Sequence, residues 1–217
     1  MSDLFDIQSA TDAWQESIGP GTAWLHGFLV DDAPQLLSLV EQIGGQSPFR
    51  HLVTPGGRTM SVAMTNCGSL GWVSDHGGYR YQAQDPLTRM PWPAMPSTLL
   101  ALAQRAASDA GYRDFQPNVC LINRYQAGAR MGLHQDRDEK NPEAPIVSFS
   151  LGLPATFIWG GLQRTGHTQR FLLKHGDALV WGGEDRFRFH GVAALKPGHH
   201  ELAGPQRINI TFRQTGS

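Results

Sequence analysis

The chain has 217 residues, of which 40% are hydrophobic and 17% charged, and its formal net charge is -1 at pH 7. This length suits a single domain with one core, and 25 glycines and 14 prolines favour a turn-rich globular fold over a disordered chain or a helical repeat. The near-zero net charge argues against an extended surface for duplex nucleic acid, although it is compatible with a small local contact.

The N-terminal segment MSDLFDIQSATDAWQES is acidic and lacks the basic and then apolar order of a signal peptide. No stretch is long and apolar enough to span a bilayer, which predicts a protein without a membrane partner. Cys67 and Cys120 show neither a CxxC spacing nor a disulfide framework, which favours reduced, partly buried thiols. We therefore expect a soluble cytoplasmic protein, and nothing in the sequence indicates more than a monomer.

In chain order, residues 22–30 are expected to form a short strand, and residues 33–43 a helix that ends at Gly44 and Gly45. Residues 46–93 are dense in Gly, Pro, Tyr and Trp without sustained periodicity, which is typical of hairpins and ordered loops. We interpret this segment as a lid.

Residues 97–110 carry Leu and Ala at helical spacing, with Ser97 as the expected N-cap and Gly111 as the C-terminal stop. This pattern predicts a helix that packs on a sheet. Residues 118–214 alternate short apolar runs with Gly, Pro and Asp clusters, which favours a barrel or jelly roll in a mainly β, α+β domain that spans residues 1–217. The expected strands are VCLINRY, IVSFSLGL, ATFIW, RFLLK, ALVWGG, FRFHGV and RINITFR.

The strongest chemical signal is the motif His134-Gln135-Asp136. Residues two apart in an extended chain point to the same face, so this imidazole and carboxylate can converge on one metal ion. His190, in the expected strand FRFHGV, could supply a third ligand. Two histidines and one carboxylate on one face of a metal leave other positions open, which an oxygenase needs.

A His-x-Asp motif is weak evidence by itself, because the chain has nine histidines and contains a second copy at residues 175–177. We interpret that copy as a hairpin turn, since a Gly-Asp pair is typical of turns. Residues 199–201, with the sequence His-His-Glu, are expected at the solvated surface. The other histidines without partner spacing are His26, His51, His76 and His167.

The C-terminal segment 207–213 alternates polar and apolar residues without a break and supports the first motif. The apolar set can pack between sheet and helix, while the polar set would line the interior beside the metal ligands. Two arginines inside a barrel require an anion, and a dicarboxylate cosubstrate would satisfy both. The interior set is Arg207, Asn209, Thr211 and Arg213; the core set is Ile208, Ile210 and Phe212.

The segment VCLINRY places Leu121, Asn123 and Tyr125 on one face by the same alternation. Asn123 and Tyr125 could donate further hydrogen bonds to the acid. The alternative for these two segments is an edge strand that carries salt bridges on its surface.

Beyond these patterns, the sequence resembles the AlkB family of 2-oxoglutarate dioxygenases, in particular its bacterial founding member, over nearly the whole chain. The resemblance implies a double-stranded β-helix, or jelly roll, at residues 118–214, with N-terminal helices and a nucleotide-recognition lid at residues 46–93. The segments that carry it are SPFRHLVTPGGRTMSVAMTNCGSLGW, GYRY, PWPAMP, FQPNVCLINRY, LHQDRDE, APIVSFSLGLPATFIWGG, HGDALVWGG, FRFHGV and RINITFRQ.

The resemblance also implies roles for individual residues. It places Fe(II) on His134, Asp136 and His190, and 2-oxoglutarate on Asn123, Tyr125, Arg207, Asn209 and Arg213. It further implies that Trp72, Tyr79, Arg80 and Tyr81 contact the substrate nucleotide, that Asp138 meets the polar edge of the base, and that Arg164 assists substrate binding. The departures from the family pattern are Arg58, where a tyrosine is expected, Trp159, where a phenylalanine is expected, and the loop GLQRTGHTQ around Arg164.

The activity implied by the resemblance is oxidative dealkylation with Fe(II), 2-oxoglutarate and O2. The expected lesions are bases of the 1-methyladenine and 3-methylcytosine type, and the products are the restored base, formaldehyde, succinate and CO2. A base within a duplex cannot reach a buried iron, so the substrate would be single-stranded or flipped. The sequence leaves open the choice between DNA and RNA.

Three alternatives remain at this point. A 2-oxoglutarate hydroxylase of proteins or small molecules would keep the carboxylate clamp but have no use for an aromatic, basic lid. A cupin-like metal binder or a reader of alkylated nucleic acid would release no succinate. A zinc hydrolase is disfavoured, because two arginines beside its metal would serve no evident purpose.

Overall fold

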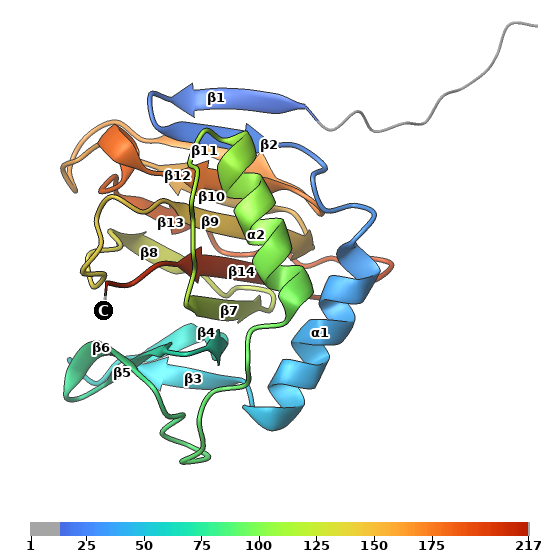
Figure 1. The fold of residues 1–217 in the computed structure, drawn as a ribbon, viewed down its shortest axis with the longest axis vertical. Helices are drawn as coiled ribbons and strands as arrows, with labels where there is room; N and C mark the ends of the chain where they lie inside the picture. The colour runs from blue at the N-terminus through green and yellow to red at the C-terminus, as the bar shows by residue number, and fades with distance from the viewer. Residues whose placement is uncertain (1–13, 217) are drawn as a thin grey trace, which may run out of the picture.

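A computed structural model describes residues 14–216, in which two antiparallel sheets face each other, a separate two-stranded hairpin forms a third sheet, and two helices lie on the outer face of the largest sheet (Figure 1). In spatial order the larger sheet contains β1 (Gln15–Gly19), β2 (Thr22–Leu25), β12 (Ala178–Trp181), β9 (Ile146–Gly152), β14 (Arg207–Arg213), β7 (Val119–Tyr125), β4 (Thr59–Gly68) and β3 (Arg50–Val53). The smaller sheet contains β11 (Gln169–Leu173), β10 (Ala155–Trp159), β13 (His190–Val192) and β8 (Met131–His134). This arrangement confirms the predicted jelly roll.

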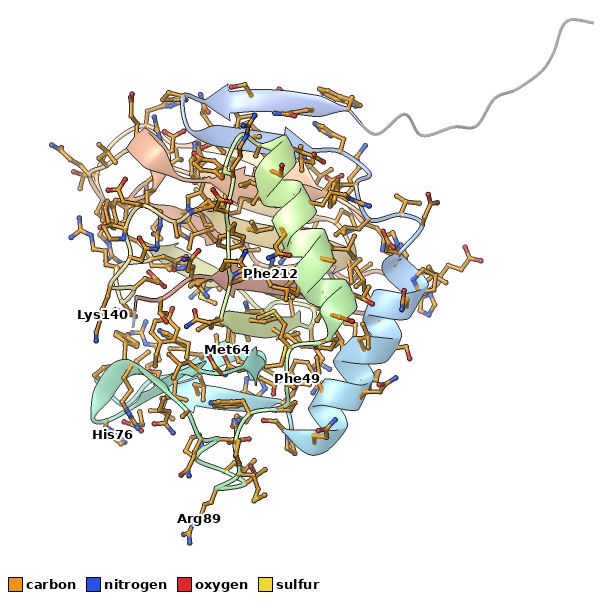
Figure 2. The ribbon with its side chains drawn as sticks, in the orientation of Figure 1. Phe49, Met64, His76, Arg89, Lys140 and Phe212 are labelled. Atoms are coloured by element: carbon orange, nitrogen blue, oxygen red, sulfur yellow. The ribbon has the colours of Figure 1, made fainter. Side chains whose placement is uncertain are left out.

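Two hydrophobic layers hold the fold together. The outer layer lies between the larger sheet and the helices α1 (Ala33–Gln46) and α2 (Ser97–Asp109), and it contains the fully buried Phe212 of β14, labelled in Figure 2. The inner layer lies between the two sheets and joins Leu121 and Trp181 of the larger sheet to Phe157 of the smaller one. Because the side chains of a strand alternate between faces, β14 contributes to the outer layer with one set of residues and faces the interior with the other.

The predicted helices are present, with two errors at their ends. The expected stop at Gly44 and Gly45 is wrong, because α1 continues to Gln46. Buried residues on one face of the helix, including Ile43, anchor it against the core, and this packing outweighs the low helix propensity of two glycines. The predicted N-cap Ser97 is instead the first helical residue after Pro96.

Three strand predictions also differ from the structure. The strand expected at residues 22–30 ends at Leu25, because the chain turns at Gly27, which has a φ of +64°. The segment FRFHGV is extended only from His190 onward. The polar β1 and the short β8 were not predicted as strands, since neither carries an apolar alternation long enough to stand out.

The predicted lid segment, residues 46–93, is partly built into the larger sheet, because β4 is ten residues long and pairs with β7. The projecting part is the hairpin of β5 (Gly71–Asp75) and β6 (Gly78–Gln82), which carries His76 at its tip in Figure 2. We call β5 and β6 the lid hairpin. The loop that follows it carries Arg89, which points away from the body of the protein (Figure 2).

Two further sequence predictions concern the environment of the chain. Cys67 and Cys120 are both free thiols and lie directly opposite each other on β4 and β7; they are fully buried, whereas the sequence predicted partial burial. Within residues 14–216, no helix is long and apolar enough to cross a membrane. Most of the N-terminal segment used to argue against a signal peptide, residues 1–13, lies outside the described residues.

Candidate active site

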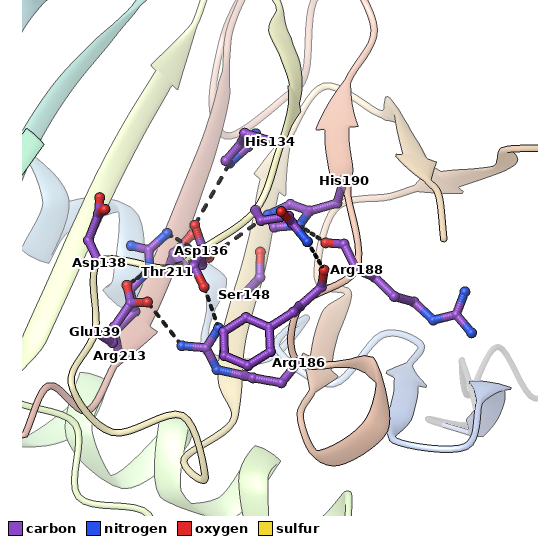
Figure 3. Close-up of polar contacts among 12 residues, drawn as sticks. His134, Asp136, Asp138, Glu139, Ser148, Arg186, Arg188, His190, Thr211 and Arg213 are labelled. Atoms are coloured by element: carbon purple, nitrogen blue, oxygen red, sulfur yellow. Dashed lines mark hydrogen bonds and ion pairs between the residues drawn. The ribbon is translucent and has the colours of Figure 1, made fainter. Parts of the chain in front are cut away.

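Three side chains that can hold a metal converge between the two sheets (Figure 3). His134 ends β8, His190 begins β13, and the two are direct partners in the antiparallel register. Asp136 follows His134 by two residues, and its carboxylate oxygens lie 3.8 Å from Nε2 of each histidine. The three potential ligand atoms lie within 4.8 Å of one another, so the convergence predicted from the sequence is confirmed as geometry.

Hydrogen bonds fix the two imidazole rings in the orientation that a metal requires. Nδ1 of His134 lies 2.9 Å from the carbonyl oxygen of Gly132, and Nδ1 of His190 lies 3.0 Å from that of Arg188. When each Nδ1–H donates to its carbonyl, each Nε2 keeps a free lone pair for the metal.

The electrostatics of the site favour the protonation states that bind metal. Burial, reinforced by the neighbouring His134, lowers the pKa of His190 from 6.5 to about 4, which keeps its ring neutral at pH 7. Burial by itself would raise the pKa of Asp136, but the guanidinium of Arg213 and the nearby histidines hold that pKa well below its usual range. A carboxylate and two imidazoles with open coordination positions are a ligand set suited to Fe(II).

The interior face of β14 carries buried cationic groups that lack partners. Arg207 is 1% exposed and donates one hydrogen bond, from Nη2 to Oγ of Ser150 at 3.0 Å. Its Nε and Nη1 have no hydrogen-bond partner among the described residues, and the same holds for Nη1 of Arg213 and Oδ1 of Asn123. Burial lowers the pKa of Arg207. Unpartnered buried donors are costly, and a bound dicarboxylate would satisfy them.

The remaining clamp residues predicted from the sequence lie around the same space. Asn209 donates from Nδ2 to Oγ of Ser148 at 2.7 Å, and its Oδ1 accepts from Nδ2 of Asn123 at 3.3 Å. Tyr125 is buried, with its ring 5.1 Å from the guanidinium carbon of Arg207. These contacts confirm the predicted faces of β14 and β7 and exclude the alternative of an exposed edge strand.

Sequence reasoning missed a buried ion-pair network beside the metal ligands (Figure 3). Glu139 accepts a hydrogen bond from Nη2 of Arg186 at 3.0 Å and lies 3.1 Å from Nε of Arg213. Arg213 in turn donates from Nη2 to Oδ2 of Asp136 at 3.0 Å. Glu139 lies within the motif LHQDRDE, so its position was visible, but its partner Arg186 carries no periodic signal.

The lid hairpin lies against the segment that follows His134. Nε1 of Trp72 donates to Oδ2 of Asp138 at 3.0 Å, and the exposed ring of Tyr79 stacks on Trp72 with ring centroids 5.6 Å apart. The hydroxyl of Tyr81 donates to Glu139. Arg80 forms an ion pair with Asp75 within the hairpin. The structure therefore brings Trp72, Tyr79, Tyr81 and Asp138 together near the metal ligands.

The residues that depart from the family pattern lie in different environments. Trp159 is buried, with its ring 6.3 Å from that of His190, so it belongs to the wall of the site. Arg58 and Arg164 are both exposed on loops. A turn is present at residues 175–177, as predicted, since Asp177 accepts hydrogen bonds from two backbone amides and Gly176 has a φ of +87°. It is not the predicted hairpin turn, because the strands that it connects, β11 and β12, belong to different sheets.

The geometry agrees with the comparisons to known proteins. The profile of the 2OG-Fe(II) oxygenase superfamily matches residues 21–213. The chain is 53% identical over 213 residues, 98% of this chain and 99% of the relative, to the alpha-ketoglutarate-dependent dioxygenase AlkB of Escherichia coli strain K12. The chain belongs to the AlkB family.

Two other AlkB-family comparisons extend this result. The DNA N(6)-methyladenine demethylase ALKBH1D of Arabidopsis thaliana is 34% identical over 147 residues, which cover 56% of this chain and 33% of the relative. The solved structure of OsALKBH1 superposes with a TM-score of 0.81 at 28% identity and covers 93% of this chain and 100% of that structure. This AlkB-family protein is thus an Fe(II)- and 2-oxoglutarate-dependent dioxygenase that consumes O2.

Proposed function

We propose that this dioxygenase removes alkyl groups from the ring nitrogens of damaged bases in single-stranded or flipped DNA, and that RNA is a second substrate. The proposed lesions are of the 1-methyladenine and 3-methylcytosine type, and the products are the restored base, formaldehyde, succinate and CO2. The observation that carries the proposal is the lid hairpin, which presents Trp72 and Tyr79 beside Asp138, two residues beyond the metal ligand Asp136. The Arabidopsis relative is named as a DNA demethylase, which supports nucleic acid as the substrate class.

We assign one set of site residues to the metal cofactor and a second set to the cosubstrate. His134, Asp136 and His190 would hold Fe(II), which with 2-oxoglutarate and O2 supplies the oxidising equivalent that hydroxylates the N-alkyl carbon. The clamp would hold the dicarboxylate in one orientation, because its unpartnered donors lie on one interior face. We assign this clamp to Asn123, Tyr125, Arg207, Asn209 and Arg213.

The lid hairpin and its neighbours would hold the damaged base. Aromatic faces such as those of Trp72 and Tyr79 bind an unstacked base, and the Asp138 carboxylate can accept a hydrogen bond from its polar edge. We assign supporting contacts to the nucleotide to Arg80, Tyr81 and Arg164. Because a base can reach this site only when it is outside a duplex, lesions that already block pairing are the least costly to bind.

The test is mass spectrometry of a singly methylated oligonucleotide incubated with the protein, Fe(II), ascorbate and 2-oxoglutarate. We expect a loss of about 14 mass units from the base together with release of succinate. A His134→Ala variant is the negative control, and matched DNA and RNA strands compare the two substrates. If succinate forms only with proteins or small molecules and no oligonucleotide loses mass, the proposed substrate class is wrong.

The Trp72→Ala variant tests the lid assignment separately. We expect it to lose most of the turnover of the oligonucleotide, because the stacking contribution of an aromatic ring is about 1–3 kcal/mol per base. Unchanged turnover in this variant would contradict the assignment.

We also propose that the enzyme acts as a monomer in the cytoplasm, which light scattering and cell fractionation would test.

A further inference from the structure

The lid hairpin contacts two consecutive carboxylates through two side chains that face each other. Trp72 of β5 and Tyr81 of β6 are direct partners in the hairpin register. Trp72 donates a hydrogen bond to Asp138, and Tyr81 donates one to Glu139. The hairpin is therefore tied to the catalytic core at two adjacent points.

These two contacts differ in their exposure to solvent. Asp138 is exposed, so an incoming polar group can replace its bond to Trp72. The Glu139 side chain is only 2% exposed, and solvent does not compete for its bond to Tyr81. Burial, together with the neighbouring acidic groups, raises the pKa of Tyr81 and keeps its hydroxyl protonated as a donor. The contact through Glu139 is thus the more persistent of the two.

Glu139 also contacts both cations that hold the metal ligand Asp136 in place. Arg213 lies between the Glu139 carboxylate, at 3.1 Å, and the Asp136 carboxylate, at 3.0 Å. Arg186 bridges Glu139, at 3.0 Å, and the backbone carbonyl of Asp136, at 2.8 Å. A displacement of Glu139 would therefore change the positions of Arg213 and Asp136 together.

We propose that Glu139 is a positioning residue that couples seating of the lid hairpin to the alignment of Arg213, so that hairpin docking and 2-oxoglutarate binding strengthen each other. The inference rests on the proposed function in assigning Arg213 to the cosubstrate, but it does not depend on the nature of the substrate. Coupling of this kind is reciprocal: if docking strengthens cosubstrate binding, the cosubstrate stabilises the docked hairpin by the same factor.

A purely structural role for Glu139 would give a different result. In that case its loss would lower the stability of the whole domain without a specific effect on the hairpin or on cosubstrate affinity. The Tyr81→Phe variant separates the two roles, because it removes one hydroxyl and leaves the ion pairs of Glu139 in place. Tyr112→Phe is the matched control, since it removes a similar hydroxyl that donates to the carbonyl of Gly21 at 2.7 Å, in the turn between β1 and β2.

The experiment measures the dissociation constant of 2-oxoglutarate by calorimetry, with Mn(II) in place of Fe(II) and without nucleic acid. We expect Tyr81→Phe and Glu139→Gln to weaken binding about fivefold or more, and Tyr112→Phe to leave it unchanged. Hydrogen exchange of residues 71–82 is the second readout. We expect 2-oxoglutarate to slow exchange there in the unmodified protein and to slow it less in Tyr81→Phe.

Two results would overturn the proposal. One is a Tyr81→Phe dissociation constant equal to that of Tyr112→Phe. The other is hydrogen exchange at residues 71–82 that does not respond to 2-oxoglutarate in the unmodified protein. Neither measurement uses an oligonucleotide, so failure of the demethylation assay would leave both interpretable.

Discussion

The same substitution at two buried arginines of the active site should have clearly different effects on stability. Arg186 uses all of its donor nitrogens, to the carbonyls of Ala144 and Asp136 and to the carboxylate of Glu139. Arg207 bonds only to Ser150, and its Nε and Nη1 lack partners among the described residues. Replacement by methionine keeps much of the aliphatic stem and removes the charge from each.

The expected magnitudes follow from these partners. Arg186→Met leaves Glu139 without one of its cations, and loss of one member of a buried pair costs about 3–5 kcal/mol, or on the order of 10 °C in Tm for a domain of this size. Arg207→Met removes two unpartnered donors, each of which costs the unliganded protein about 1–3 kcal/mol. Loss of the Ser150 bond offsets part of this gain. We therefore expect the free energy of unfolding to stay about unchanged or to rise by up to about 4 kcal/mol.

Arg207→Met should be harmful once 2-oxoglutarate is bound, although it is not expected to destabilise the unliganded protein. Removal of one partner from a buried charge pair costs about 2–5 kcal/mol, which corresponds to roughly 30-fold to several-thousand-fold weaker 2-oxoglutarate binding. Scanning calorimetry of both variants, with and without Mn(II) and 2-oxoglutarate, measures stability and ligand stabilisation together. If Arg207→Met destabilises the unliganded protein as much as Arg186→Met does, Arg207 is a structural residue and the argument for a dicarboxylate clamp fails.

Three further predictions concern other parts of the chain. Since the pKa of His190 is about 4 in the metal-free fold against 6.5 for an ordinary histidine, the unfolded chain binds the extra proton first as pH falls. Metal-free protein should lose up to about 3 kcal/mol of stability as pH falls from 6.5 to 4, and denaturant titrations should show a smaller loss for His190→Gln. Gly45→Ala should stabilise the protein by about 0.5–1 kcal/mol through α1, because an added Cβ meets open space. Thermal unfolding should show a smaller gain in stability for Gly44→Ala, whose Cβ would lie 3.1 Å from the Phe49 ring. Trp159→Phe should change the ratio of kcat/KM between methylated adenine and cytosine oligonucleotides by more than it changes metal affinity. An unaltered ratio would show that Trp159 does not contribute to the choice of substrate.

The most accurate sequence predictions came from patterns within one short segment of the chain. The unbroken alternation of residues 207–213 predicts both faces of β14, because side chains of a strand point alternately to the two sides whatever the rest of the fold does. The spacing of His134 and Asp136 also predicts two converging ligands correctly, although β8 ends at His134 and Asp136 lies two residues beyond it. His190 was found because its chemistry completes a ligand set, although only half of the strand predicted around it, from His190 onward, is a strand in the structure.

The features missed by sequence depend on contacts between distant segments. Arg186 follows a short 3-10 turn at Gly183–Asp185 and reaches Glu139, 47 residues earlier in the chain. No periodicity specifies where a side chain beside such a turn will point. The continuation of α1 through Gly44 is a second example, since local propensity predicts an end there and only the tertiary core explains why the helix continues.

The charge balance of the interior explains why so polar a centre can exist between two sheets. Arg186 and Arg213 form ion pairs there with the carboxylates of Asp136 and Glu139, and Arg207 is buried without an anionic partner among the described residues, which leaves an excess of positive charge before any ligand binds. A dication alone would increase that excess, while a dicarboxylate alone would offset it; the two together leave it unchanged. Cofactor and cosubstrate should therefore favour each other electrostatically. Arg213 contacts both sides of this balance, because its Nε and Nη2 donate to the metal ligand Asp136 while its Nη1 has no partner among the described residues.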